Sequence, residues 1–119
     1  MASRILIIED DADTAEVLRE FLQDEGFQVQ LASTGKDAMQ RFKKRPFDLL
    51  IADLRLPDMD GREVVSACAE SVQTRLSVVF LSGARLRETW AAAPPKVRFL
   101  LLEKPCRPKT ILAAVRKLL

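Results

Sequence analysis

Residues 49–61 read LLIADLRLPDMDG, a short apolar run that ends in Asp53 and is followed by a turn segment. An apolar run bounded by turn residues is typical of a fully buried strand in a parallel sheet. In open parallel sheets, ligands bind just beyond the carboxyl ends of the strands. Asp53 stands at this position, where its carboxylate would be held rigidly and still be reachable. Because Asp is also common in turns, this stretch alone leaves open whether Asp53 is functional or only caps the turn.

The size and composition of the chain predict one ordinary globular domain. It has 119 residues, of which 48% are hydrophobic and 30% are charged, and a net charge of +2. So small a charge does not indicate nucleic acid or an anionic membrane as a partner. The chain has no histidine, which excludes His-based acid–base chemistry and His metal ligands. Cys68 and Cys106 lack the spacing of metal or redox motifs, so we expect reduced thiols and a cytoplasmic location.

Apolar runs and turn residues predict an alternation of strands and helices along the whole chain. The expected strands cover residues 5–8, 27–32, 48–53, 76–81 and 97–102. The expected helices cover residues 12–25, 34–45, 61–71, 85–93 and 108–119, with the fourth the weakest because Pro94 and Pro95 follow it. This order predicts an α/β fold, a flavodoxin-like doubly wound (βα)5 arrangement. Its five-stranded parallel sheet would have the order 2-1-3-4-5 and helices on both faces.

Polar side chains follow four of the five expected strands. Glu9–Asp11 follow the first strand, Asp53 ends the third, Ser82 follows the fourth, and Lys104 follows the fifth. In the strand order 2-1-3-4-5 these four strands are neighbours, and their carboxyl ends lie at one edge of the sheet. The sequence therefore predicts that these side chains converge on a single pocket.

The chemistry of such a pocket is specific. Carboxylates a few ångströms apart repel one another unless a cation neutralises them. Oxygen ligands without His or Cys nearby select Mg²⁺, with Mn²⁺ as a second possibility, rather than zinc. A carboxylate beside such an ion can act as a nucleophile toward a phosphoryl group. Lys104 would neutralise charge on the phosphoryl oxygens, and Ser82 would donate a hydrogen bond to one of them.

Each strand end also has an ordinary structural interpretation. Glu9–Asp11 could start a helix with acids that its dipole favours, Ser82 and Gly83 could form a plain turn, and Lys104 could simply leave the strand. Taken singly, each of these interpretations is at least as good as the functional one. Four strand ends that together make one coherent metal and phosphoryl site are not expected by chance.

The chain resembles the receiver domains of two-component response regulators, the CheY-like superfamily, over essentially its whole length. The matching pieces are ILIIEDD at 5–11, DLRLPDMDG at 53–61, Ser-Gly-Ala at 82–84 and Lys-Pro at 104–105. The resemblance implies that Asp53 is the phosphoacceptor, with Ser82 and Lys104 as its catalytic partners. It implies that Glu9, Asp10, Asp53 and the backbone carbonyl of Arg55 hold Mg²⁺. Asp11 is expected to begin the following helix instead.

The function implied by the resemblance is a signalling switch rather than an enzyme. The domain would accept a phosphoryl group from the phosphohistidine of a sensor histidine kinase or a histidine phosphotransfer protein. It would catalyse only its own phosphorylation and dephosphorylation, and it would relay a conformational change to a downstream protein or output domain. Residues 1–119 are expected to be one receiver domain without an effector domain, and no direct contact with nucleic acid or membrane is expected.

Three alternatives stay open at this point. The first is a receiver-like module that binds proteins without being phosphorylated, which the intact set of site residues disfavours. The second is a phosphohydrolase with an Asp nucleophile, but such enzymes typically have a second Asp where this chain has Arg55. The third is a flavin-binding protein, which is weaker because the acidic loop after the first strand would repel a phosphate.

The chain departs from the family at the fifth strand and before it. Many receivers carry Tyr or Phe three residues before the lysine as a switch residue, and this chain has Leu101 there. Phe99 lies two residues earlier and is a possible substitute. Because of the two prolines at 94 and 95, we expect the fourth helix to be short or displaced, with Trp90 packing over the gap.

Overall fold

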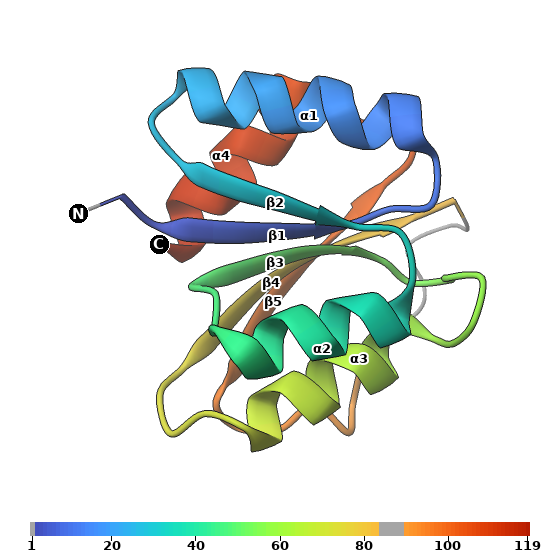
Figure 1. Ribbon diagram of the computed structural model, residues 1–119, viewed down its shortest axis with the longest axis vertical. Helices are drawn as coiled ribbons and strands as arrows, with labels where there is room; N and C mark the ends of the chain where they lie inside the picture. The colour runs from blue at the N-terminus through green and yellow to red at the C-terminus, as the bar shows by residue number, and fades with distance from the viewer. Residues whose placement is uncertain (1, 84–89) are drawn as a thin grey trace.

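The computed structural model describes residues 2–83 and 90–119, which form a five-stranded parallel sheet covered by helices on both faces (Figure 1). The strand order is β2-β1-β3-β4-β5, so the predicted fold class and topology are confirmed. The strands are β1 (Arg4–Ile8), β2 (Gln28–Ala32), β3 (Leu49–Asp53), β4 (Leu76–Ser82) and β5 (Val97–Glu103). Each lies within one or two residues of its predicted range.

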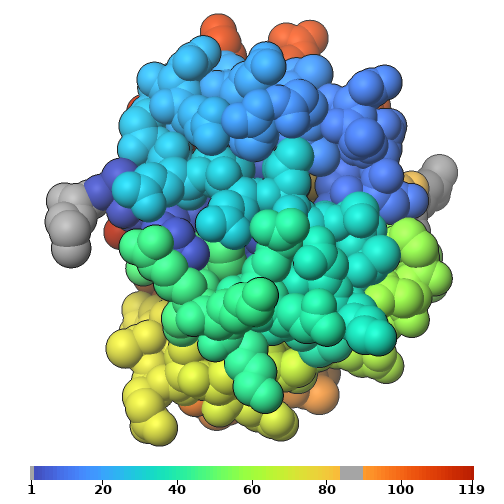
Figure 2. All heavy atoms as spheres, in the orientation of Figure 1, coloured from blue at the N-terminus to red at the C-terminus, as the bar shows by residue number. Residues whose placement is uncertain are grey.

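The helices of the described residues are α1 (Ala12–Asp24), α2 (Gly35–Lys44), α3 (Gly61–Glu70) and α4 (Pro108–Leu118). In Figure 1, α1 and α4 cover one face of the sheet and α2 and α3 cover the other. In the space-filling view, the side chains of α1, α2 and the edge strand β2 cover most of the face in view (Figure 2). None of these helices is long and apolar enough to cross a membrane.

The predicted helix over residues 85–93 falls largely outside the described residues, because 84–89 are not among them. Its last residues, 90–93, are described and form a turn in which the N–H of Ala93 donates to the carbonyl of Trp90 at 3.1 Å. For these residues the prediction of a helix was wrong. The physical reason is that a proline disfavours helical backbone at the residue before it and cannot donate a helical hydrogen bond.

Side chains of the strands alternate between two apolar cores. Leu50 and Ala52 of β3 point to the α2–α3 side, and Leu49 and Ile51 point to the α1–α4 side. Every residue of β3 is buried, as the continuous apolar run predicts for the central strand of a parallel sheet. The parallel register pairs Ile8 with Ala52 and Asp53 with Leu81, so the carboxyl ends of the strands lie together at one edge.

Lys96 makes a tertiary contact that the sequence did not predict. Its ammonium donates hydrogen bonds to the carbonyls of Ala69 at 3.0 Å and Val72 at 2.7 Å. Carbonyls at the end of a helix lack intrahelical partners, and Lys96 supplies one at the end of α3. This contact lies just before β5, at the edge of the sheet where the strands begin.

Candidate functional site

An acidic cluster lies where β1 and β3 end. Carboxylate oxygens of Glu9, Asp10 and Asp53 all lie within 4.8 Å of one another. Glu9 is 7% exposed and Asp53 4% exposed, whereas Asp10 is exposed. Glu9 and Asp53 are buried because Glu9 directly follows β1 and Asp53 ends β3, two neighbouring inner strands, so the fold places two carboxylates side by side under the surface.

Lys104 supplies the positive charge of the cluster. It follows β5, and its ammonium nitrogen lies 2.9 Å from Asp53 Oδ1 and 3.5 Å from Glu9 Oε2. Its backbone N–H donates to the carbonyl of Ser82 at 2.7 Å, which ties the ends of β4 and β5 together. Ser82 is 7% exposed at the end of β4 and lies at the same edge of the sheet. The structure therefore brings Glu9, Asp10, Asp53 and Lys104 together, and it places Ser82 at the same edge of the sheet.

Two buried oxygens of the cluster, Glu9 Oε2 and Asp53 Oδ1, accept no hydrogen bond of acceptable geometry from any residue that the structure describes. Lys104 lies close to both and compensates charge, yet it does not satisfy them as a hydrogen-bond donor. A buried acceptor left unsatisfied costs about 1–3 kcal/mol, and more when it is charged. A cation coordinated by these oxygens would remove that cost. The donor set is all oxygen and includes both buried and exposed carboxylates, which fits Mg²⁺ or Mn²⁺.

Burial and neighbouring charge shift the pKa of both Glu9 and Lys104. Burial first, and then the neighbouring carboxylate of Asp53, raise the pKa of Glu9 to about 8. Burial lowers the pKa of Lys104, but the interactions with Asp53 and Glu9 outweigh it, so that this pKa is raised overall. Lys104 is therefore a permanent cation near neutral pH, and Glu9 holds a proton there when no metal is bound.

The raised pKa of Glu9 predicts how stability depends on pH without metal. Between about 4.5 and 8 the folded chain keeps a proton on Glu9 that the unfolded chain has lost. The unfolding free energy must therefore fall as pH rises through this window, by up to about 1.4 kcal/mol per pH unit for one proton. Glu9→Gln has no ionisable group at this position, so its unfolding free energy should change less with pH. Urea unfolding of both proteins at pH 5.5–8.5 with EDTA measures the difference, and parallel profiles would contradict the shift.

Asp11 belongs to a helix cap and not to the acidic cluster. Its carboxylate accepts hydrogen bonds from the backbone N–H of Asp13 at 3.1 Å and from the hydroxyl of Thr14 at 2.9 Å. These hydrogen bonds, that of the Thr14 side chain first, lower the pKa of Asp11. The expectation that Asp11 begins the first helix is confirmed.

The loop after Asp53 folds tightly against the strand end. The N–H of Leu54 donates to the carbonyl of Leu81 at 3.0 Å, and that of Gly61 donates to the carbonyl of Leu54 at 2.6 Å. A Cβ on Gly61 would lie only 2.2 Å from the carbonyl oxygen of Asp53. Arg55 is exposed on this loop and forms an isolated antiparallel bridge with Asp60. The part of Arg55 assigned to the metal site, its backbone carbonyl, remains a prediction.

A cavity of about 660 Å³ opens beside the acidic cluster, and Glu9 and Lys104 form part of its wall. Its apolar lining includes Val17 of α1 and Ile111 of α4. Val17 is 59% exposed, one of the few large apolar side chains of the described residues that face solvent. The cavity thus places Glu9 and Lys104 of the site beside an apolar surface between α1 and α4.

On the opposite side of the sheet, aromatic side chains pack between β4, β5 and the segment before β5. The ring of Phe80 lies 5.6 Å from that of Trp90 and 6.0 Å from that of Phe99, and the rings of Trp90 and Phe99 lie 5.6 Å apart. Trp90 therefore packs on β4 and β5 through Phe80 and Phe99, and whether it covers a gap left by the fourth helix depends on residues outside those described. Phe99 and Leu101 are both partly buried against the same core.

Comparison with known proteins adds evidence about the family. A family model described as "Response regulator receiver domain" matches residues 5–116. The transcriptional regulatory protein PcoR of Escherichia coli is 41% identical over 68 residues, which are 57% of this chain and 30% of that protein. The regulatory protein LuxO of Vibrio vulnificus (strain YJ016) is 32% identical over 115 residues, which are 93% of this chain and 25% of that protein.

Comparison with a solved structure also supports a receiver domain. The structure of a response regulator receiver domain (CheY-like) from Methylobacillus flagellatus has a TM-score of 0.85 to this chain and 27% sequence identity, and the match covers 100% of both chains. The match to each of the two curated relatives spans less than a third of that protein's length.

Proposed function

The chain belongs to the family of response regulator receiver domains, and on this premise we propose that it is a phosphorylation-activated switch whose phosphoacceptor is Asp53. The observation that carries the proposal is the cluster of oxygen ligands at the strand ends, where the buried Glu9 Oε2 and Asp53 Oδ1 accept no well-formed hydrogen bond from the described residues, although Lys104 lies close to both. Such a site is incomplete without a cation, and Mg²⁺ is usually bound by one or two carboxylates together with phosphoryl oxygens.

In the proposed reaction a carboxylate oxygen of Asp53 attacks the phosphorus of a phosphohistidine. The new O–P bond forms, the P–N bond breaks, and the imidazole leaves with the electron pair. Glu9, Asp10, Asp53 and the backbone carbonyl of Arg55 would hold Mg²⁺, which when bound neutralises the carboxylates and the phosphoryl oxygens. Water later breaks the acyl phosphate and restores Asp53.

Lys104 and Ser82 take roles that follow from their positions. The ammonium of Lys104 lies 2.9 Å from Asp53 Oδ1 and would pair with the phosphoryl oxygens as negative charge arrives there. Ser82 ends β4 next to the position of Lys104, and its hydroxyl would donate a hydrogen bond to the same group. Because β4 also carries Phe80, a movement at Ser82 has a short route to the aromatic contacts with Trp90 and Phe99.

The partners we propose are a sensor histidine kinase or a histidine phosphotransfer protein, and a downstream protein or output domain. The donor would approach across the cavity between α1 and α4, because that cavity has Glu9 and Lys104 in its wall and the exposed Val17 at its side. In this proposal residues 1–119 act as one receiver domain in the cytoplasm, and the domain catalyses only its own phosphorylation and dephosphorylation.

Labelling with a small phosphodonor tests the proposed function directly. The protein is incubated with acetyl phosphate and Mg²⁺, and intact mass spectrometry follows the gain of one phosphoryl group. We expect a single modification. EDTA should prevent it by removing Mg²⁺, and hydroxylamine should remove it, because hydroxylamine cleaves acyl phosphates. No modification, or a product that resists hydroxylamine, would contradict phosphorylation at Asp53 and favour the binding module that works without it.

A further inference from the structure

The segment between β3 and α3 forms a small hairpin that projects from the end of β3. Arg55 and Asp60 make the bridge at its base, and the N–H of Leu56 donates to the carbonyl of Met59 at 3.0 Å. This pairing places Pro57 and Asp58 at the tip. In the space-filling view the lime-green side chains of this segment lie at the edge of the molecule, beside those at the start of α2 (Figure 2).

Asp58 binds the first turn of α2 from this tip. Its Oδ1 accepts a hydrogen bond from the backbone N–H of Gly35 and its Oδ2 from that of Lys36, both at 2.9 Å. These two hydrogen bonds lower the pKa of Asp58, so that its carboxylate is ionised at neutral pH. The start of an α-helix attracts negative charge, because its first N–H groups have no partner within the helix.

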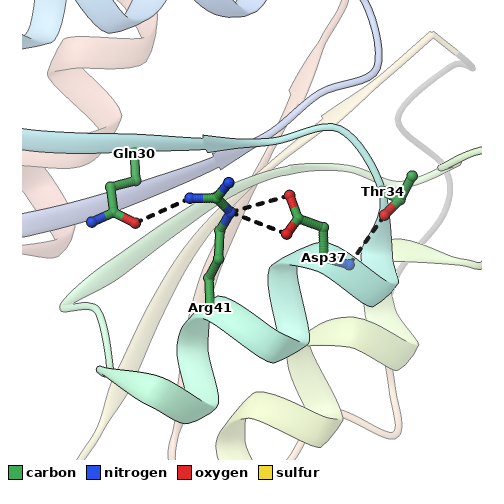
Figure 3. Close-up of polar contacts among 4 residues, drawn as sticks. All are labelled: Gln30, Thr34, Asp37 and Arg41. Carbon is green, nitrogen blue, oxygen red and sulfur yellow. Dashed lines mark hydrogen bonds and ion pairs between the residues drawn. The ribbon is translucent and has the colours of Figure 1, made fainter.

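The hydrogen-bond count at this helix end is complete. The N–H of Asp37 donates to the hydroxyl of Thr34 at 3.1 Å, as Figure 3 shows, and the N–H of Ala38 donates to the backbone carbonyl of Thr34. Thr34 is therefore the local cap, and Asp58 is a second cap that comes from another part of the chain. Without Asp58, the N–H groups of Gly35 and Lys36 would lose their hydrogen-bond acceptor and would depend on water.

Helix α2, which binds the tip of the hairpin, is itself attached to the edge of the sheet. The side chain of Arg41 lies between Asp37 and Gln30 and bonds to both, at 3.1 Å and 3.4 Å, which ties the helix to β2 (Figure 3). Gly35 is buried and packs closely against Met59 of the hairpin. A Cβ added at position 35 would lie only 2.6 Å from Met59 Cγ. The tip of the hairpin is thus held by two hydrogen bonds and one close apolar contact.

We propose that Asp58 is a positioning residue for the metal site, which acts by fixing the hairpin whose base carries the backbone carbonyl of Arg55. This proposal rests on the proposed function. The other end of the segment is fixed as well, since the N–H of Leu54 bonds to Leu81 of β4. Arg55 lies between these two attachments, so its carbonyl is ordered before any ion arrives.

A metal ion binds more tightly when its ligands are already ordered, and this matters most for Mg²⁺ and Mn²⁺ sites. Mg²⁺ demands near-ideal octahedral geometry, and a ligand that must first be ordered weakens binding by the entropy it loses. Groups that orient metal ligands typically contribute about 10–100-fold to metal affinity. Because Met59 still holds the tip when Asp58 is absent, we expect the lower end of this range.

The test is titration of the native chain and of Asp58→Ala with Mn²⁺, with the free ion counted by its electron paramagnetic resonance signal. We expect Asp58→Ala to bind Mn²⁺ about tenfold more weakly. Asp58→Asn keeps one acceptor oxygen and should recover part of that loss. Amide hydrogen exchange at Gly35 and Lys36 reports in the same samples whether the contact to the helix is broken.

Two control variants separate the contact from other effects. Glu63→Gln removes an exposed carboxylate from the first turn of α3 and tests the loss of charge alone. Lys96→Ala breaks the contact at the far end of α3 and tests a loss of stability alone. Both should bind Mn²⁺ within about twofold of the native chain, since Glu63 meets the hairpin only through its backbone N–H, which the substitution keeps, and Lys96 lies at the far end of α3.

The possible outcomes distinguish this proposal from the proposed function. If Asp58→Ala exposes the amides of Gly35 and Lys36 yet binds Mn²⁺ as the native chain does, the positioning role is wrong and the proposed function stands. If either control weakens binding as much as Asp58→Ala, the role is also wrong. If the native chain itself does not bind Mn²⁺, the proposed function fails and this proposal fails with it.

Discussion

Replacing Asp53 with Asn should reduce labelling by acetyl phosphate to the limit of detection. Asp53 is the buried carboxylate at the end of β3, and the amide of Asn is not a nucleophile toward phosphorus. Asn has the same shape, so the position of Lys104 and the packing of β3 should persist. The measurement is intact mass after incubation with acetyl phosphate and Mg²⁺.

Asp11→Asn is the matched control for this prediction. Asp11 is a carboxylate at the same edge of the sheet, but its oxygens cap α1 through Asp13 and Thr14. This variant should be labelled like the native chain, with at most a loss of about 1 kcal/mol in unfolding free energy from the weakened cap. Undiminished labelling of Asp53→Asn would assign the phosphoryl group to another residue, and peptide mapping would show which one.

The second large effect is expected from Gly61→Ala, which should lower the unfolding free energy by about 3 kcal/mol. The added Cβ would lie 2.2 Å from the carbonyl oxygen of Asp53 and 3.3 Å from the Cα of Leu54. Both atoms belong to the backbone, so no side-chain rotation relieves the contact and the end of β3 must shift. Because this carbonyl belongs to Asp53 itself, the metal site should be distorted together with the fold.

Gly83→Ala is the corresponding control. Gly83 also follows a strand end of this site, yet a Cβ there would meet none of the described residues within 4 Å. Urea unfolding should therefore show a change of less than about 1 kcal/mol for Gly83→Ala. If the two alanine variants were equally stable, the close approach of Gly61 to Asp53 would not be the reason that glycine stands at this position.

Much of the fold was predictable because its strongest signals are local. The runs at 5–8 and 49–52 are apolar without interruption, a pattern typical of a buried strand in a parallel sheet. In the strand order of a flavodoxin-like arrangement, the positions of Glu9, Asp53 and Lys104 at one edge follow from their places at the strand ends. Their convergence could therefore be predicted from the order of residues along the chain.

The prediction of a helix over residues 85–93 was wrong for its last part, residues 90–93, and the reason is also present in the sequence. Trp90–Ala93 have a composition that a helix tolerates, but Pro94 and Pro95 follow at once. The structure has a turn there, and Trp90 packs on Phe80 and Phe99. Aromatic packing and proline geometry outweighed a weak helical preference.

The local hydrophobic pattern and the alternation of elements were enough to predict the strands of the parallel sheet and the set of side chains at their carboxyl ends. Packing in three dimensions was needed to bring Asp58 to the start of α2, 22 and 23 residues away in the sequence, and to raise the pKa of Glu9 to about 8. Both depend on which backbone and charged groups meet after packing. A hydrogen bond between distant segments or the burial of a carboxylate arises from three-dimensional proximity, which no short stretch of sequence encodes.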